Sequence, residues 1–150
     1  MLSLKIALLS LFALSYTPHQ PKDAPDVAAL KQFEKIRAAI EKDGKGVMDT
    51  PIAITGDING DNRPDCIVSY VLTPKGGGNM IIGDGHYIYL NIGSGMKAAG
   101  KFPSFKFCYS LDAIKAGVIH VKKYKCAPPY NESDGVGKLV YKSSKIVEIK

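Results

Sequence analysis

The spacing of apolar residues predicts one amphipathic helix in the N-terminal third of the chain. Apolar side chains recur at steps of three and four residues at Val27, Leu30, Phe33, Ile36 and Ile40. This spacing places them on a single face of a helix. Asp23 is expected to cap the start of this helix, with Pro25 in its first turn. Gly44 and Gly46 are expected to end it near Asp43, so the helix presents one apolar face to a sheet.

Beyond the helix, the pattern predicts about seven or eight short strands, because apolar runs alternate with Gly-, Pro-, Asn- and Ser-rich turns. The expected strands cover residues 51–55, 67–72, 80–82, 86–92, 105–111, 118–124, 138–141 and 145–149. The links between them are short enough for hairpins. We therefore expect an α+β fold in which residues 24–150 form a single domain, with the helix packed on a mostly antiparallel sheet.

Between the first two of these strands lies a segment rich in side-chain oxygen. Its potential ligands are Asp57, Asn59, Asp61 and Asp65. Calcium takes six to eight oxygen ligands, and these residues occupy positions 1, 3, 5 and 9 of a calcium-loop spacing. Gly60 and Asn62 tolerate the positive φ that a tight turn requires. Arg63 stands where such loops use a backbone carbonyl, and its side chain is expected to point to solvent.

The loop departs from an EF-hand, which needs Gly at position 6 and Glu at position 12, because Asn62 and Val68 stand there. The spacing Asp-x-Asn-Gly-Asp-x-x-x-Asp followed by a strand resembles the calcium loop of integrin-α-like FG-GAP and VCBS repeats. That resemblance implies calcium as the cofactor. The implied ligands are the side chains of Asp57, Asn59, Asp61 and Asp65 and the carbonyl of Arg63. A single repeat does not imply a β-propeller, and a metal-free turn between two strands is the alternative interpretation.

The N-terminal segment has the pattern of a secretory signal peptide over residues 1–15. Lys5 provides a positive charge, residues 6–14 are a short apolar run, and residues 13–15 fit a small-x-small cleavage site. The run is too short to span a membrane, so no transmembrane segment is expected. A buried N-terminal helix is the alternative. We expect export to a periplasm or to the outside, with residues 16–23 as a linker ahead of the domain.

Three cysteines are consistent with an oxidising compartment but not with a disulfide-rich scaffold. We prefer a Cys108–Cys126 disulfide, which would close a short loop, although three pairings are possible. Cys66 begins an expected core strand and is interpreted as a buried apolar residue. The competing interpretation, a cysteine nucleophile, has no assignable His or Asn partner.

A formal net charge of +6 at pH 7 favours an acidic protein or an anionic envelope polymer as partner. Lysines that only keep a small domain soluble are the alternative. The basic segment beside Tyr124 could contact nucleic acid, but export argues against that partner. The glycine-rich stretch 74–79 is not followed by Gly-Lys-Ser or Gly-Lys-Thr, so it is not a phosphate-binding loop.

Three functions remain open from the sequence. The favoured one is a calcium-braced, non-enzymatic protein-binding module, with an inhibitor or immunity-type protein as one form of it. No catalytic dyad or zinc motif is recognisable, and the two histidines of the domain, His86 and His120, are expected on the surface. The second is a small calcium-dependent hydrolase of the cell envelope, with its acids among Asp57, Asp61, Asp65 and Asp84. The third is a structural component of the envelope.

Overall fold

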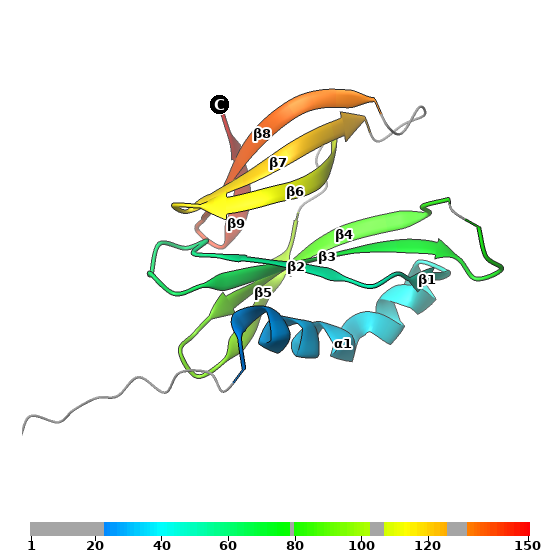
Figure 1. Cartoon of the computed structure of the whole chain (residues 1–150), viewed down its shortest axis with the longest axis horizontal. Helices are drawn as coiled ribbons and strands as arrows, with labels where there is room; N and C mark the ends of the chain where they lie inside the picture. The colour runs from blue at the N-terminus through cyan, green and yellow to red at the C-terminus, as the bar shows by residue number, and fades with distance from the viewer. Residues whose placement is uncertain (1–22, 79, 103–106, 126–131) are drawn as a thin grey trace, which may run out of the picture.

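The computed structural model describes residues 23–78, 80–102, 107–125 and 132–150 (Figure 1). It contains the helix α1 (Pro25–Asp43) and the strands β1 (Gly46–Met48), β2 (Ile52–Gly56), β3 (Asp65–Pro74), β4 (Gly83–Asn91), β5 (Met96–Lys101), β6 (Phe107–Lys115), β7 (Val118–Lys125), β8 (Ser133–Lys142) and β9 (Lys145–Ile149). All strand pairs are antiparallel. The α+β prediction is therefore confirmed.

The strands form two sheets instead of the one we predicted. Sheet A has five strands in the order β1-β3-β4-β5, with β2 also paired to β3. The register places β1 opposite the end of β3 and β2 opposite its start, so both lie on the edge of β3 away from β4. Sheet B is the meander β6-β7-β8-β9. Strand β3 is therefore the centre of sheet A, and the acidic loop leads directly into it.

The molecule has three layers: α1, sheet A and sheet B (Figure 1). One core lies between the helix and sheet A, and its buried residues are Ala29, Phe33, Met48, Cys66, Val68, Leu72, Tyr89 and Met96. A second core lies between the two sheets, and its buried residues are Ile58, Ile67, Ile88, Phe102, Ile119, Val121, Leu139 and Ile146. Successive residues of β3 serve opposite layers, because side chains of a strand alternate between its two faces.

The helix has the bounds expected from its periodicity, but its ends differ from the prediction. Ala24 is the N-cap residue, and it makes no side-chain cap. Asp23 instead accepts a hydrogen bond from Lys31 Nζ at 2.9 Å. Gly46 does not end the helix but belongs to β1, where a Cβ would lie 2.8 Å from the Thr73 carbonyl oxygen. Glycine is required there because β1 approaches β3 closely.

Three further strand predictions were wrong. The strands β1 and β5 were not expected, because β1 has only three residues and β5 has no large apolar residue after Met96, so neither shows a period. The expected strand over residues 80–82 is absent, and those residues are exposed. Of the strand expected over 105–111, residues 107–111 belong to β6, and residues 105 and 106 lie outside the described part of the chain. The proposed signal peptide and almost all of the linker also fall outside it.

Among the described residues, no helix is long and apolar enough to cross a bilayer.

Candidate metal centre

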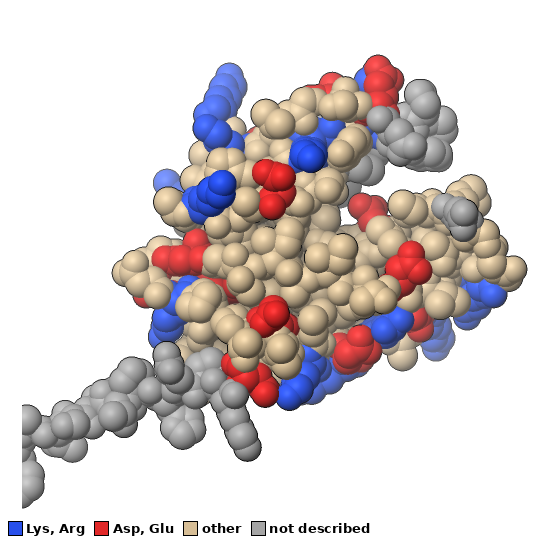
Figure 2. All heavy atoms as spheres, in the orientation of Figure 1, with Lys and Arg blue, Asp and Glu red and all other residues tan. Residues whose placement is uncertain are grey.

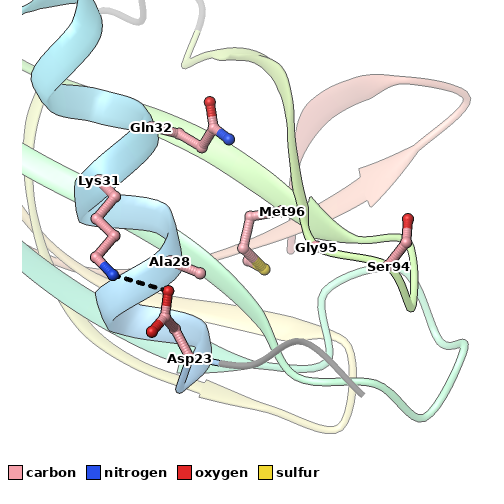
Figure 3. Close-up of a pocket in the computed structure, with 7 residues that line it drawn as sticks. All are labelled: Asp23, Ala28, Lys31, Gln32, Ser94, Gly95 and Met96. Atoms are coloured by element: carbon pink, nitrogen blue, oxygen red, sulfur yellow. Dashed lines mark hydrogen bonds and ion pairs between the residues drawn. The ribbon is translucent and has the colours of Figure 1, made fainter. Parts of the chain in front are cut away.

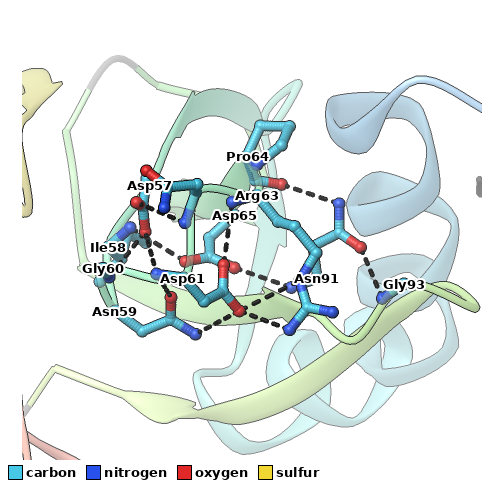
Figure 4. A network of polar contacts seen from close by, with 11 residues as sticks. Asp57, Ile58, Asn59, Gly60, Asp61, Arg63, Pro64, Asp65, Asn91 and Gly93 are labelled. Atoms are coloured by element: carbon cyan, nitrogen blue, oxygen red, sulfur yellow. Dashed lines mark hydrogen bonds and ion pairs between the residues drawn. The ribbon is translucent and has the colours of Figure 1, made fainter. Parts of the chain in front are cut away.

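The acidic loop, residues Asp57–Asp65, connects β2 to β3 at the edge of sheet A (Figure 4). The two strands pair up to the ends of the loop, where Gly56 lies opposite Asp65. The first and last oxygen-bearing side chains of the motif are therefore brought to the same end of a hairpin. This confirms that the loop joins two neighbouring strands.

Asp57 organises the first half of the loop through its carboxylate. Oδ1 accepts hydrogen bonds from the backbone N–H of Gly60 at 2.7 Å and of Asp61 at 3.2 Å. Oδ2 accepts one from the N–H of Asn62 at 2.9 Å. Gly60 and Asn62 have φ of 81° and 62°, as expected from their tolerance of positive φ. The turn is thus closed by local bonds to one carboxylate.

Asp61 lies at the centre of the polar network. Asn59 Nδ2 donates to Asp61 Oδ2 at 3.0 Å, and Asn59 Oδ1 accepts from the Asp61 N–H at 3.0 Å. The guanidinium of Arg63 reaches the same Oδ2, with Nη2 at 2.6 Å and Nε at 3.1 Å. These hydrogen bonds from Arg63 are the main reason that the pKa of Asp61 is lowered. The Arg63 side chain is exposed, as expected, but it also pairs with Asp61.

Asp65 is the buried member of the motif, with none of its surface exposed. Its Oδ2 accepts a hydrogen bond from the N–H of Ile58 at 2.9 Å, and its Oδ1 accepts one from the N–H of Asn91 at 2.8 Å. Burial raises the pKa of this carboxyl, and the backbone donors oppose that shift. One carboxylate therefore holds the loop, β3 and β4 together. Ile58 anchors the same loop in the core between the sheets.

Asn91 is a site residue that the sequence analysis missed. It lies at the end of β4, is buried, and donates from Nδ2 to the Pro64 carbonyl oxygen at 3.3 Å. Its Oδ1 accepts a hydrogen bond from the N–H of Gly93 at 2.9 Å. The sequence does mark Asn91 as an asparagine before a Gly-Ser-Gly turn at the end of an apolar strand. No pattern in the neighbouring residues, however, indicates that this turn lies beside the acidic loop.

The chemistry of the donors fits calcium. Four side chains of the motif carry oxygen, and three of them are carboxylates. The polar atoms of Asp57, Asn59 and Asp61 gather on one side of the loop (Figure 4). Within the described residues, however, no group of three or more His, Cys, Asp or Glu side chains is arranged to hold a metal ion. In this arrangement the carboxylate oxygens of Asp57 and Asp61 accept hydrogen bonds from backbone N–H groups and from the Arg63 side chain, all within the loop.

His86 is buried, contrary to our expectation of a surface position, with 8% of its surface exposed. Its Nδ1 lies 2.8 Å from Ser69 Oγ, its direct cross-strand neighbour. Its ring contacts Phe102 at a centroid distance of 4.9 Å. Burial lowers the pKa of His86, and Asp84 and the backbone of Tyr109 oppose that shift. His86 therefore lies where the two sheets meet.

A shallow hollow of about 260 Å³ lies between α1 and the β4–β5 turn (Figure 3). Its lining residues are Asp23, Ala28, Lys31, Gln32, Ser94, Gly95 and Met96. The two charged groups, Asp23 and Lys31, face each other and form an ion pair. Their pairing engages the groups that would otherwise orient a ligand, so we place no site there.

The cysteine predictions have different outcomes. Cys66 is a free and fully buried thiol in the core beneath the helix, as expected. Burial raises the pKa of this thiol to about 12, so the reactive thiolate is disfavoured. The side chains of Cys108 and Cys126 lie outside the described residues, and their disulfide remains a prediction.

No protein-family model, curated protein or solved structure matches this chain.

Proposed function

We propose that this protein is an exported, non-enzymatic binding module whose two-sheet fold is braced by calcium in the acidic loop. The ligands would be the side chains of Asp57, Asn59, Asp61 and Asp65 and the carbonyl of Arg63. Bound calcium would supply the positive charge that offsets repulsion among the three carboxylates. We place this module in the periplasm or outside the cell, where an inhibitor or immunity-type role against another protein is one form that binding would take.

The calcium proposal rests on one observation: the loop is anchored to the sheets on its inner side and exposes oxygen-bearing side chains on its outer side. Its inner side is fastened by Asp65 and by the buried side chain of Ile58. Its outer side presents Asp57, Asn59 and Asp61, which are at least partly accessible. An ion held between these outer side chains and Asp65 would therefore be linked to the junction of β2, β3 and β4. That position favours a structural role for the metal.

Calcium would have to compete with Arg63 for the carboxylate of Asp61. Arg63 is exposed in its pair with Asp61, and solvent-exposed ion pairs are weak. A cation of charge +2 with several oxygen ligands is a stronger partner than one guanidinium in this setting. Replacing Arg63 with Gln should therefore leave calcium affinity unchanged or raise it, because the carbonyl ligand is kept. A large loss of affinity in Arg63→Gln would contradict this competition.

The test of the calcium proposal is thermal unfolding with calcium and with EDTA. At a calcium concentration of about 100 times Kd, binding to the folded state adds about 2.7 kcal/mol. For a chain of this size we expect a rise in melting temperature of about 5 to 10 °C. Asp61→Ala should abolish this rise, whereas Asp112→Ala, an exposed acid on β6, should retain it. Equal rises in both variants, or none in the unaltered protein, would refute the calcium brace.

Export is tested separately by N-terminal sequencing of protein recovered from the periplasm or the medium. Cleavage of residues 1–15 predicts a mature chain that begins at Tyr16. An exported chain that keeps Met1 would contradict the signal-peptide prediction.

A second candidate function, a small calcium-dependent hydrolase, is favoured by one contact. Ser69 Oγ and His86 Nδ1 are 2.8 Å apart, which is within reach for a nucleophile and its base. The burial of His86 weighs against it, because a substrate must reach the hydroxyl. A fluorophosphonate probe that labels the unaltered protein but not Ser69→Ala would support the hydrolase, and no labelling would exclude a reactive Ser69.

A further inference from the structure

The outer face of sheet B, the side turned away from sheet A, is uncovered in the described structure. The inward residues Ile119, Val121, Leu139 and Ile146 belong to the core between the sheets. Since side chains alternate along a strand, the residues between them face outward. No described helix or strand packs on that side, because α1 lies on the far side of sheet A (Figure 1). A complete sheet face is therefore left open to a partner.

This face carries a row of β-branched apolar residues across three strands. The register places Val118 on β7 opposite Val140 on β8, and Val140 opposite Val147 on β9. Val136 and Ile149 extend the apolar surface from that row in one direction, toward the start of β8. Val136 is 81% exposed and Val147 is 45% exposed. Such residues stabilise a sheet best when something covers them.

Five exposed lysines are distributed around the valine row by the same alternation. They are Lys115, Lys122, Lys138, Lys142 and Lys145. Lys115 lies opposite Val118, and Lys142 lies opposite Lys145. None of the five forms an ion pair with another described residue, whereas the neighbouring Lys123 and Lys125 pair with Glu148 and Glu132. The face therefore concentrates uncompensated positive charge.

Acidic residues are few on these strands: Glu148 on β9 alternates to the other face, opposite Leu139, and pairs with Lys123. Asp112 is at a bulge on the edge strand β6, and Asp134 is near the start of β8. Elsewhere the two charges are mixed: Figure 2, which views the layers from the side, shows acidic and basic side chains interspersed. The outer face of sheet B thus differs from that surface in its balance of charges.

We propose that this lysine–valine face, defined by the five lysines and by Val118, Val136, Val140, Val147 and Ile149, docks an acidic protein surface. Protein interfaces combine apolar contacts with charged groups, and the lysines interleaved with the apolar residues here would select an acidic partner. A second copy of this chain is disfavoured because the same lysines would oppose each other. This inference names the partner class of the proposed binding function and rests on it.

The experiment uses a random copolymer of glutamate and tyrosine as the acidic polypeptide probe. Its affinity for the mature protein is measured by isothermal titration calorimetry in calcium. Replacing Lys138 and Lys142 together with Gln should weaken binding by about tenfold. The matched control replaces Lys97 and Lys101 on β5 with Gln, removes the same charge, and should change affinity less than about twofold. Equal losses in the two variants, or no binding by the unaltered protein, would overturn the proposal.

The apolar row is tested by Val140→Thr with Val147→Thr, which keeps the β-branched shape while adding hydroxyls. We expect a loss of about fivefold for the copolymer. Phosphatidylglycerol vesicles and polyphosphate are titrated in parallel, with no valine dependence expected for either. If they bind as tightly as the copolymer, or if the valine variant binds the copolymer normally, an anionic surface of any kind is the target and the protein-docking proposal fails.

The calcium brace and the docking face can fail independently. Asp61→Ala is titrated with the copolymer at a temperature where its circular dichroism matches that of the unaltered protein. Retained binding of the copolymer supports the docking proposal for the lysine–valine face, whatever the outcome of the calcium melting test. Binding lost in Asp61→Ala although the fold is intact would overturn the assignment to sheet B, because Asp61 lies outside that sheet.

Discussion

The most direct test of the architecture is Asp65→Asn, because this buried carboxylate joins the acidic loop to β4. In the native protein, Oδ1 accepts the N–H of Asn91 and Oδ2 accepts the N–H of Ile58. Asparagine has nearly the same shape but keeps only one acceptor. Its NH2 group would face one of the two buried N–H donors. The substitution therefore removes one acceptor without creating a cavity.

The expected cost follows from the groups left unsatisfied. One backbone N–H loses its acceptor, and the new amide NH2 gains none, each at about 1–3 kcal/mol. Burial raises the pKa of Asp65, which shows that ionising this carboxyl is itself opposed by its surroundings. A neutral amide does not carry a buried charge, so we expect the loss of unfolding free energy to fall in the lower part of this range, at about 2 to 4 kcal/mol. That is a large share of the 5–15 kcal/mol typical of a domain.

The assay is urea unfolding at pH 7 in EDTA, so that metal binding does not contribute. Asp112→Asn is the control, because it removes the same charge from an exposed site and should change stability by no more than about 0.5 kcal/mol. If Asp65→Asn unfolds at the same urea concentration as this control, then the two backbone bonds do not brace the fold, and our account of the loop is wrong.

Three further predictions use side chains in the two cores. Burial lowers the pKa of His86, so the unfolded chain takes up the proton first and the protein should lose stability as pH falls below about 6.5. His86→Gln should flatten this dependence in urea unfolding between pH 7.5 and 5.5, and an unchanged slope would contradict the burial of His86. Cys66 is buried and its thiol pKa is raised to about 12, so it should resist iodoacetamide in the native protein and react once urea unfolds the chain. Mass spectrometry of the Cys66 peptide measures the labelling, and rapid labelling of the native protein would contradict the burial of this thiol. Gly56→Ala would bring a Cβ within 2.6 Å of a β6 side chain and should lower the free energy of unfolding by about 1–3 kcal/mol. The control Gly76→Ala, with open space around the new Cβ, should lower it by less than about 0.5 kcal/mol in the same urea assay. Equal losses of stability would contradict the packing of β2 on β6.

The helix and the acidic loop were predictable because each depends on nearby residues. The apolar stripe of α1 has a period that needs no partner to be recognised, and the helix has the bounds it predicted. The loop was predicted from side chains that reach backbone donors only a few positions away, such as Asp57 and Asn62. The positive φ at Gly60 and Asn62 follows from the same local requirement.

The missed features depend on residues far apart in the chain. His86 was expected on the surface because it stands at the start of its expected strand, but sheet B and Phe102 bury it. Asn91 was read as part of a strand, although its backbone N–H reaches Asp65 from 26 positions away. Neither contact can be inferred from the spacing of residues that are close in the sequence.

By itself, the sequence determined the α+β class, the helix, most of the strands and the order of oxygen-bearing side chains in the loop. Periodicity and turn chemistry act over a few residues, so they can be recognised without coordinates. Only the tertiary structure decided that the strands divide into two sheets, that Asp65 and Asn91 join the loop to β4, and that one sheet face is left open. Those outcomes depend on which apolar faces bury one another, and burial is a property of the whole packed chain.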